Sequence, residues 1–136
     1  MVREIVRDER FLSLPSRDAT EDDALVIRDL EDTLRANRNV CVGMAANMIG
    51  VRKNIIIVAC GPMPVVMVNP AVVKKSGEYV TKEGCLSLDG ERECVRYHEI
   101  EVVYLDSSFN KRRGKFSGIM AEIIQHEIDH LRGIVI

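Results

Sequence analysis

The sequence has no long apolar run, no signal-like N-terminus and no excess of one charge. Its longest apolar stretches, such as residues 65–68, are far shorter than the ~20 residues that span a bilayer. The first four residues, Met-Val-Arg-Glu, lack the apolar core of a secretory signal peptide. The formal net charge of −2 gives no electrostatic reason to expect nucleic acid or an anionic membrane as a partner. We therefore predict a cytoplasmic protein without nucleic-acid or membrane partners.

Closely spaced cysteine pairs are also missing. No two of the four cysteines form a CxxC pair, which argues against a closed four-cysteine zinc site, and these cysteines are Cys41, Cys60, Cys85 and Cys94. In the cytoplasm they should stay reduced. A chain of 136 residues, 46% hydrophobic and 29% charged, is large enough for a core without disulfides. Because no internal repeat or linker is visible, residues 1–136 are predicted to form a single domain.

The order of the expected elements indicates an α+β fold. A first helix is expected from about residue 22 to about residue 37, because apolar residues recur with helical spacing at Val26, Ile27, Leu30 and Leu34. Strands are expected at residues 54–60, 65–69, 78–81 and 101–105, and a polar loop with a basic tip at residues 106–114. A last helix is expected over residues 117–131 and should end before Gly133.

The array Gln125-His126-Glu127-Ile128-Asp129-His130 contains two of the three histidines. Residues four apart share one face of an α-helix, so His126 and His130 can bind the same metal ion. Glu127 lies beside them and can act as a general base toward metal-bound water. Two helix histidines without a metal are the alternative, but the amphipathic helix favours the metal. The array therefore predicts metal-assisted hydrolysis.

A third metal ligand has to come from upstream, because residues 131–136 contain no His, Asp, Glu or Cys. Cys85 is the best candidate, since thiolates bind zinc-like metals and Gly84 lets the backbone approach closely. A small core residue is the alternative for Cys85 and the expectation for the other three cysteines. Cys85 could also be the nucleophile of a cysteine hydrolase, which would leave Glu127 without a role.

Three segments together resemble the peptide deformylase family. The array matches its third motif, QHExDH, at every defined position, and the sequence Glu83-Gly84-Cys85-Leu86-Ser87 matches its second motif, EGCLS. Its first motif, GxGxAAxQ, is matched by Gly43, Ala45 and Ala46, whereas Cys41 replaces the first glycine and Met48 the final glutamine. The resemblance implies the deformylase version of the α+β class, with antiparallel or mixed sheets packed around a C-terminal helix that carries HExxH.

The resemblance also implies a role for each residue of the site. Cys85, His126 and His130 would hold one divalent metal ion, ferrous iron in the active form, with zinc or nickel possible; ligand chemistry alone favours zinc. Glu127 would be the general acid-base, and the backbone N–H of Leu86 would help to hold the oxyanion. Gln125 and Asp129 would orient ligands, although Asp129 could be a plain surface carboxylate. The implied substrate-binding residues are Val42, Gly43, Glu122 and Ile123.

Two of the departures from the family pattern, at Met48 and Glu122, bear on the reaction and its substrate. Met48 cannot donate the hydrogen bond that the usual glutamine gives to the oxyanion, and loss of such a donor costs about 10²–10³ in turnover. Glu122 stands where the family usually has an apolar residue of the methionine pocket, so it could alter which first residue is accepted. An exposed helical carboxylate is the alternative.

These residues predict a hydrolase that removes the N-formyl group from formyl-methionine of nascent proteins, with reduced or altered activity. Its partners would be N-formylated peptides or nascent chains, near the ribosome. Two other functions stay open: a non-catalytic, metal-containing, peptide-binding homologue, which Met48 favours, and a metallo-amidase with a different acyl substrate.

Overall fold

The computed structural model describes residues 1–59, 61 and 63–135. The elements in chain order are the helices and strands α1 (Glu9–Leu12), η1 (Glu21–Asp23), α2 (Ala24–Ala36), β1 (Gly43–Ala45), η2 (Ala46–Ile49), β2 (Ile55–Val58), β3 (Val65–Cys85), β4 (Leu88–Leu105), β5 (Lys111–Ser117) and α3 (Gly118–Leu131). η1 and η2 are short 3₁₀ helices. Both predicted helices are present, and Gly133 follows α3 with a φ of 78°, which favours glycine.

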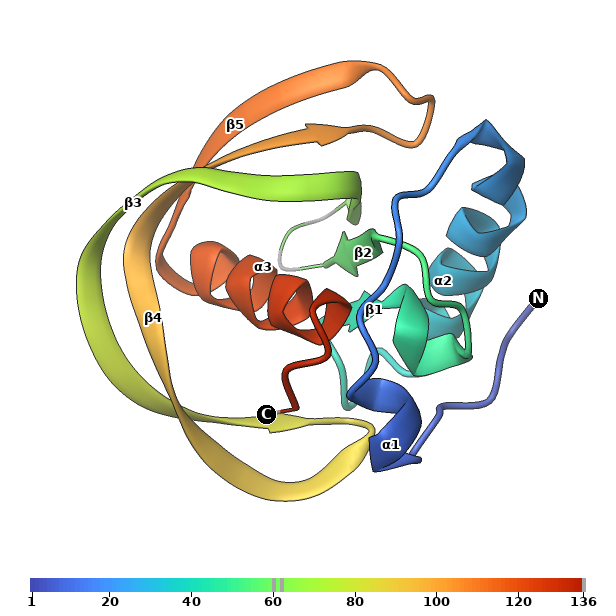
Figure 1. Cartoon of the computed structure of the whole chain (residues 1–136), viewed down its shortest axis with the longest axis horizontal. Coiled ribbons are helices and arrows are strands. Elements are labelled where there is room, and N and C mark those ends of the chain that lie inside the picture. The colour runs from blue at the N-terminus through green and yellow to red at the C-terminus, as the bar shows by residue number, and fades with distance from the viewer. Residues whose placement is uncertain (60, 62, 136) are drawn as a thin grey trace.

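The described strands form one five-stranded sheet in the order β1-β2-β3-β4-β5, and every neighbouring pair is antiparallel. β3 and β4 are 21 and 18 residues long and make a hairpin that curves around α3 (Figure 1). Register shifts interrupt their pairing between Val68 and Ala71 and between Val72 and Lys74. Such bulges bend and twist a hairpin, which allows the sheet to enclose the helix. The predicted α+β class is confirmed.

The strands predicted at residues 78–81 and 101–105 are parts of β3 and β4, which are much longer than expected. No strand was predicted at residues 70–77, but this segment of β3 also pairs with β4, where Ser76 faces Glu99 and Glu78 faces Tyr97. The predicted loop at 106–114 was wrong for residues 111–114, which begin β5. Arg113, whose register partner is Val103, forms an ion pair with its diagonal neighbour Glu101 of β4, and cross-strand contacts of this kind support a strand with exposed side chains. Residue 60 of the first predicted strand lies outside the described residues.

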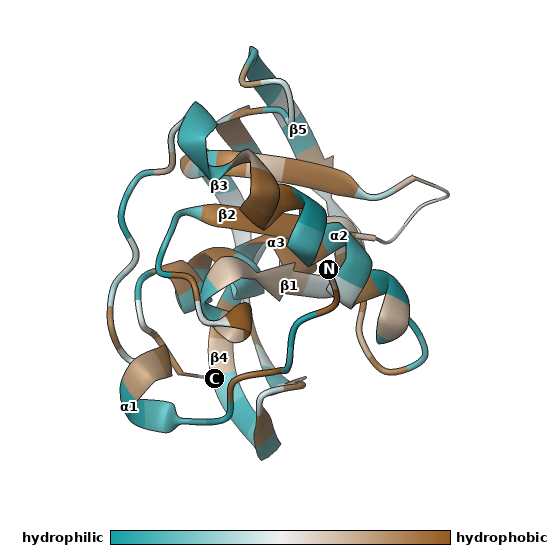
Figure 2. Ribbon diagram, turned by 90° about the vertical axis from the view of Figure 1, so that its right-hand side faces the viewer, coloured by the Kyte–Doolittle hydropathy of each residue, from teal (hydrophilic) through white to brown (hydrophobic). Residues whose placement is uncertain are grey.

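α3 lies at the centre of the molecule, between the β3–β4 hairpin and the part of the chain that contains β1, β2 and α2 (Figure 1). Its residues Ala121, Ile124 and Ile128 are buried, whereas Ile119, at its first turn, is exposed. β2 is apolar along its length (Figure 2), and all four of its residues are buried. A helix enclosed in this way can carry polar side chains toward a cavity while its other faces supply the core.

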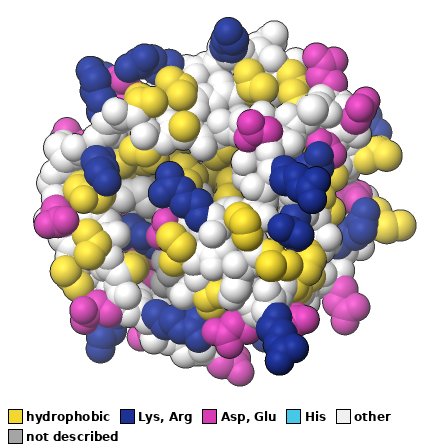
Figure 3. All heavy atoms as spheres, viewed as in Figure 1, with side chains coloured by type: hydrophobic (Ala, Val, Ile, Leu, Met, Phe, Trp, Pro, Cys, Tyr) yellow, Lys and Arg dark blue, Asp and Glu magenta, His cyan; other side chains and the backbone are white. Residues whose placement is uncertain are grey.

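The outer surface carries charges of both signs. Lys, Arg, Asp and Glu side chains are interspersed across the face seen in Figure 3, in keeping with the small net charge. Within the part of the chain that the structure describes, no helix has the length and apolar character needed to cross a membrane.

Candidate metal centre and active site

The structure brings Cys85, His126 and His130 together. Cys85 is the last residue of β3, and the two histidines lie one turn apart on α3. Their potential ligand atoms all lie within 4.8 Å of one another, and the two Nε2 atoms are 3.0 Å apart. Two imidazoles and a thiol that converge on one point form a donor set suited to a zinc-like divalent metal with an open fourth position.

The two histidines have opposite electrostatic surroundings. Burial lowers the pKa of His126, but hydrogen bonds with Cys85 and Glu83 outweigh it and raise the pKa to about 10. Burial and the nearby charge of His126 lower the pKa of His130 to about 3, so this ring is neutral and free to bind a metal. Its Nδ1 atom is buried without a hydrogen-bond partner among the described residues. A metal that binds here must displace the proton of His126.

Glu83 and Arg96 fix the orientation of His126 from behind. Nδ1 of His126 lies 2.7 Å from Oε1 of Glu83, and Arg96 donates to both carboxylate oxygens of Glu83. Arg96 is only 3% exposed and also donates to Asp129 at 2.7 Å. Burial raises the pKa of Glu83, but its hydrogen bonds with His126, Arg96 and Glu122 prevail and lower it to about 2. A carboxylate held in this way orients a metal-ligating histidine and increases its basicity.

The sequence did not suggest a role for Arg96. The structure shows that Arg96 faces the site, because in the β3–β4 register it pairs with Tyr79 and lies on the same side as Glu83. The period-2 alternation along β3 and β4 could have shown this, once their pairing was known.

Gln125 and Asp129 both join α3 to β4. The Gln125 amide accepts from the backbone N–H of Tyr97 at 2.9 Å and donates to its carbonyl at 2.8 Å. Asp129 accepts from Arg96, so its alternative as an unpartnered surface carboxylate is excluded. These bonds fix the rotation of α3 relative to the hairpin that supplies Cys85.

Glu127 is a buried carboxylate beside the metal group. It is 4% exposed, and its Oε1 atom has no hydrogen-bond partner among the described residues. Burial raises its pKa to about 7. A Cβ atom on Gly43 would lie 3.0 Å from Oε2 of Glu127 and 2.8 Å from Ile123, so only glycine fits here without a shift. A carboxyl whose pKa lies near neutrality is suited to move a proton.

A cavity of about 270 Å³ opens onto this group. Cys85, His126 and Glu127 line it together with the remaining predicted substrate-side residues, and these are Val42, Gly43, Met48, Leu86, Glu122 and Ile123. His130 lies behind it and is not among the lining residues. Cys41 also lines the cavity, and it is a half-buried residue that packs against the core. Burial, followed by the charges of Glu127 and Cys85, raises the pKa of Cys41 to about 11.

Met48 and Asn47 both lie at the η2 turn, but they face different ways. Met48 is buried and lines the cavity, and its Sδ accepts from the backbone N–H of Ala45 at 3.4 Å. The Asn47 amide instead donates to the backbone carbonyl of His130 at 2.8 Å. Asn47 therefore does not supply the donor that Met48 lacks, and it fastens η2 to the end of α3.

A central HExxH helix, a cysteine from a neighbouring strand and a buried glutamate define the class of metal-site hydrolases. Residues 2–136 match the sequence profile of the family described as polypeptide deformylase. A peptide deformylase from Clostridium beijerinckii is 53% identical over 136 residues, which are 100% of this chain and 100% of that protein. The chain belongs to the polypeptide deformylase family.

Solved structures agree with this assignment. A crystal structure of peptide deformylase from Ehrlichia chaffeensis has a TM-score of 0.89 and 32% identity and covers 99% of this chain and 86% of its own. A class I type b peptide deformylase from Acinetobacter baumannii, crystallised with Met-Ala-Ser bound, has a TM-score of 0.87 and 30% identity, with 99% and 96% covered. The family and the deformylase function predicted from the motifs are therefore confirmed.

Proposed function

We propose that this protein hydrolyses the N-formyl group of N-formylmethionyl peptides and nascent chains and releases formate. The observation that carries this proposal is the buried Glu127 carboxylate, whose unpartnered oxygen adjoins the group formed by Cys85, His126 and His130. An amide bond is unreactive without both a positioned proton donor and charge stabilisation at its oxygen. The cavity offers residues for both.

The metal would be held by Cys85, His126 and His130, and ferrous iron is our proposal for the active form, with zinc or nickel as alternatives. Bound there, a divalent ion supplies an activated water and a positive charge for the oxyanion. Glu127 takes up a proton and delivers it to the leaving amine. The backbone N–H of Leu86 donates to the oxyanion, and Glu83 keeps the His126 ring in place.

The peptide would lie in the cavity beside Val42, Gly43 and Ile123. Gly43 leaves room for a substrate backbone next to Glu127, since no side chain projects from that position. The Acinetobacter relative binds Met-Ala-Ser, a deformylated peptide of the kind that this reaction would release. Nascent chains emerging from the ribosome would present the same N-terminal group.

Formate release from formyl-Met-Ala-Ser, with protein reconstituted anaerobically with ferrous iron, tests the proposal. Acetyl-Met-Ala-Ser is the matched control substrate. Hydrolysis of the formyl peptide alone supports a deformylase, whereas hydrolysis of the acetyl peptide alone would indicate a different metallo-amidase. Because Met48 offers no amide donor, a non-catalytic peptide-binding role is a second candidate. Binding of the formyl peptide with no formate release from the metal-loaded protein would favour it.

A further inference from the structure

Glu122 lies beside the carboxylate that orients His126, but it has no place in the mechanism above. It is half-buried on α3, four residues before His126 and therefore on the same face of the helix. Glu83 of β3 contacts both residues: its Oε1 lies 2.7 Å from Nδ1 of His126, and its side chain shares a hydrogen bond with Glu122. Glu122, a departure from the family pattern, is thus connected to the metal group through one carboxylate.

The hydrogen bond between the two glutamates requires a proton, because two ionised carboxylates are both acceptors. Burial raises the pKa of Glu122, and the hydrogen bond with Glu83 raises it further, whereas the bond with Tyr79 lowers it. Burial also raises the pKa of Glu83, but contacts with His126 and Arg96 outweigh it and leave this pKa at about 2. The shared proton therefore belongs to Glu122, and Glu83 is the acceptor.

An ionised Glu122 would also lack a positive partner. No ion pair among the described residues includes it, and Arg96, the buried cation nearby, is already shared by Glu83 and Asp129. One cation therefore faces two carboxylates. A third negative charge at the same place would meet like charges without compensation, which disfavours the ionised form of Glu122.

Tyr79 determines how the Glu122 carboxyl is used. Its hydroxyl donates to Oε1 of Glu122 at 2.9 Å, and its ring stacks on His98 with centroids 4.1 Å apart. Burial, followed by the bond to Glu122, raises the pKa of Tyr79 to about 12, so the hydroxyl keeps its proton. With Oε1 accepting from Tyr79, the other oxygen of Glu122 is left to carry the proton toward Glu83.

The Glu83 carboxylate has room for this donor at its second oxygen. Its Oε1 accepts from Nη2 of Arg96 at 2.7 Å and also lies against the His126 ring, whereas its Oε2 accepts from Nε of Arg96 at 3.0 Å. Glu83 is only 8% exposed. A lone pair left open on a buried carboxylate costs free energy, so a further donor stabilises the orientation in which Glu83 contacts His126.

We propose that Glu122 is a positioning residue of the metal centre: as a neutral carboxylic acid, it donates a hydrogen bond to Glu83 and so holds the carboxylate that orients His126. This inference concerns the metal site of the proposed function and not the choice of substrate. Metal binding tests it whether or not the protein releases formate, so the two proposals can fail separately.

Metal affinity in two variants separates a hydrogen-bond donor from a side chain that only fills space. In Glu122→Gln, the amide oxygen can accept from Tyr79 while the amide N–H donates to Glu83. Glu122→Met has a similar length and no hydrogen to donate. We expect zinc affinity, measured by competition with a metal-binding dye, to fall about tenfold or more in Glu122→Met and to stay within about threefold of the parent in Glu122→Gln.

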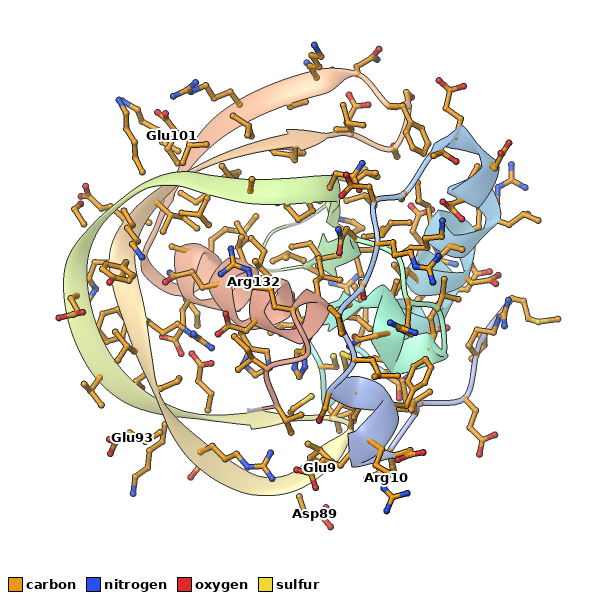
Figure 4. The ribbon with its side chains drawn as sticks, in the orientation of Figure 1. Glu9, Arg10, Asp89, Glu93, Glu101 and Arg132 are labelled. Carbon is orange, nitrogen blue, oxygen red and sulfur yellow. The ribbon has the colours of Figure 1, made fainter. Side chains whose placement is uncertain are left out.

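Glu93→Gln and Glu93→Met are the matched controls. Glu93 is exposed and lies on the outer side of the hairpin, pointing away from α3 (Figure 4), so neither change should alter zinc affinity. Equal affinities in the parent and in Glu122→Met would overturn the assignment. Equal losses in Glu122→Met and Glu122→Gln would also overturn it, because the amide keeps the donor.

Infrared spectroscopy detects the proton itself. A protonated carboxyl has a C=O stretching band that an ionised carboxylate lacks. At a pH above the ordinary range of carboxyl pKa values, the metal-free parent should show an acid band that is lost in Glu122→Gln and kept in Glu93→Gln. Glu127 is present in all three proteins, so its band cancels in the difference spectra. If the parent and Glu122→Gln had the same acid band, Glu122 would be ionised and could not be the donor.

Discussion

At the scale of single residues, Glu127 combines a functional advantage with a cost to folding. Its pKa of about 7 results from burial, so the folded protein binds this proton more tightly than the unfolded chain, where a glutamate titrates near 4.5. The stabilising contribution of the proton is complete below pH about 4.5 and is lost as the pH rises through about 7. The carboxylate form, which the proposed mechanism uses as a base, is therefore the form that the fold disfavours.

Glu127→Gln should separate these two effects. In metal-free protein, we expect the parent to lose about 2–3 kcal/mol of stability relative to the variant between pH 5 and pH 8. Urea unfolding at both pH values, with a chelator present, measures the difference. The metal-loaded variant should lose about 10²–10⁴ in turnover. Glu93→Gln, on the exposed hairpin, should change neither quantity. A pH-independent stability difference would refute the burial argument.

In the proposed mechanism, Met48 would limit the support of the oxyanion. Its sulfur accepts from Ala45 N–H and has no hydrogen to donate toward the cavity. In Met48→Gln, the side-chain oxygen can take over the bond from Ala45, which leaves the amide N–H free to face the substrate. We expect formate release to rise at least tenfold, since one oxyanion donor is worth about 10²–10³ in turnover. Metal content has to be equal in both proteins. An unchanged rate would show that the reaction does not need this donor.

At the scale of elements, α3 and the β3–β4 hairpin are joined by one buried guanidinium. Arg96 of β4 bridges Glu83 of β3 and Asp129 of α3, whose side chains are only 7% and 20% exposed. Removing one member of a buried ionic group leaves the others uncompensated. Arg96 therefore links the strand that ends in Cys85 to the helix that carries both histidines.

Arg96→Leu should destabilise the protein by about 3–5 kcal/mol, because two buried carboxylates lose their partner. Metal affinity should fall about 10- to 100-fold, since Glu83 no longer fixes the His126 ring. Chemical unfolding and competition with a metal-binding dye measure these changes. Arg92→Leu on the same strand is the control. Its pair with Glu9 is 3.7 Å long and exposed, so about 0–1 kcal/mol is expected. Equal losses in both variants would contradict the bridging role.

The elements that could be predicted from the sequence were those with local patterns. Helical periodicity placed α3 and therefore the spacing of His126, Glu127 and His130, and family motifs added Cys85. The length of β3 and β4 was missed because their charged outer faces resemble loops when the partner strand is unknown. Arg96 was missed for the same reason: the side of the sheet that a residue faces depends on register, which is a long-range property.

At the scale of the whole molecule, the three potential ligands come from segments about 40 residues apart in sequence, since Cys85 precedes His126 and His130 by that span. Such a group exists only in the folded chain, so a metal that binds it stabilises the fold by mass action. The buried and unpartnered polar atoms of Glu127 and His130 indicate that the metal-free fold is not optimised at this site. Folding and metal binding should therefore be strongly coupled.

Adding a divalent metal at 100 times its Kd should stabilise the protein by about 2.7 kcal/mol, which corresponds to a rise in Tm of roughly 10 °C. The pKa of His126 is raised to about 10, so metal binding displaces its proton. For each proton released, the apparent metal affinity should fall about tenfold when the pH is lowered by one unit. Thermal unfolding with zinc or with anaerobic ferrous iron, at pH 6 and pH 8, measures both effects.

Cys85→Ser should abolish most of the rise in Tm. Cys94→Ser, a half-buried thiol outside the ligand group, should keep it. If the two serine variants responded alike to the metal, Cys85 would not be a ligand, and the converging donors of β3 and α3 would need another explanation.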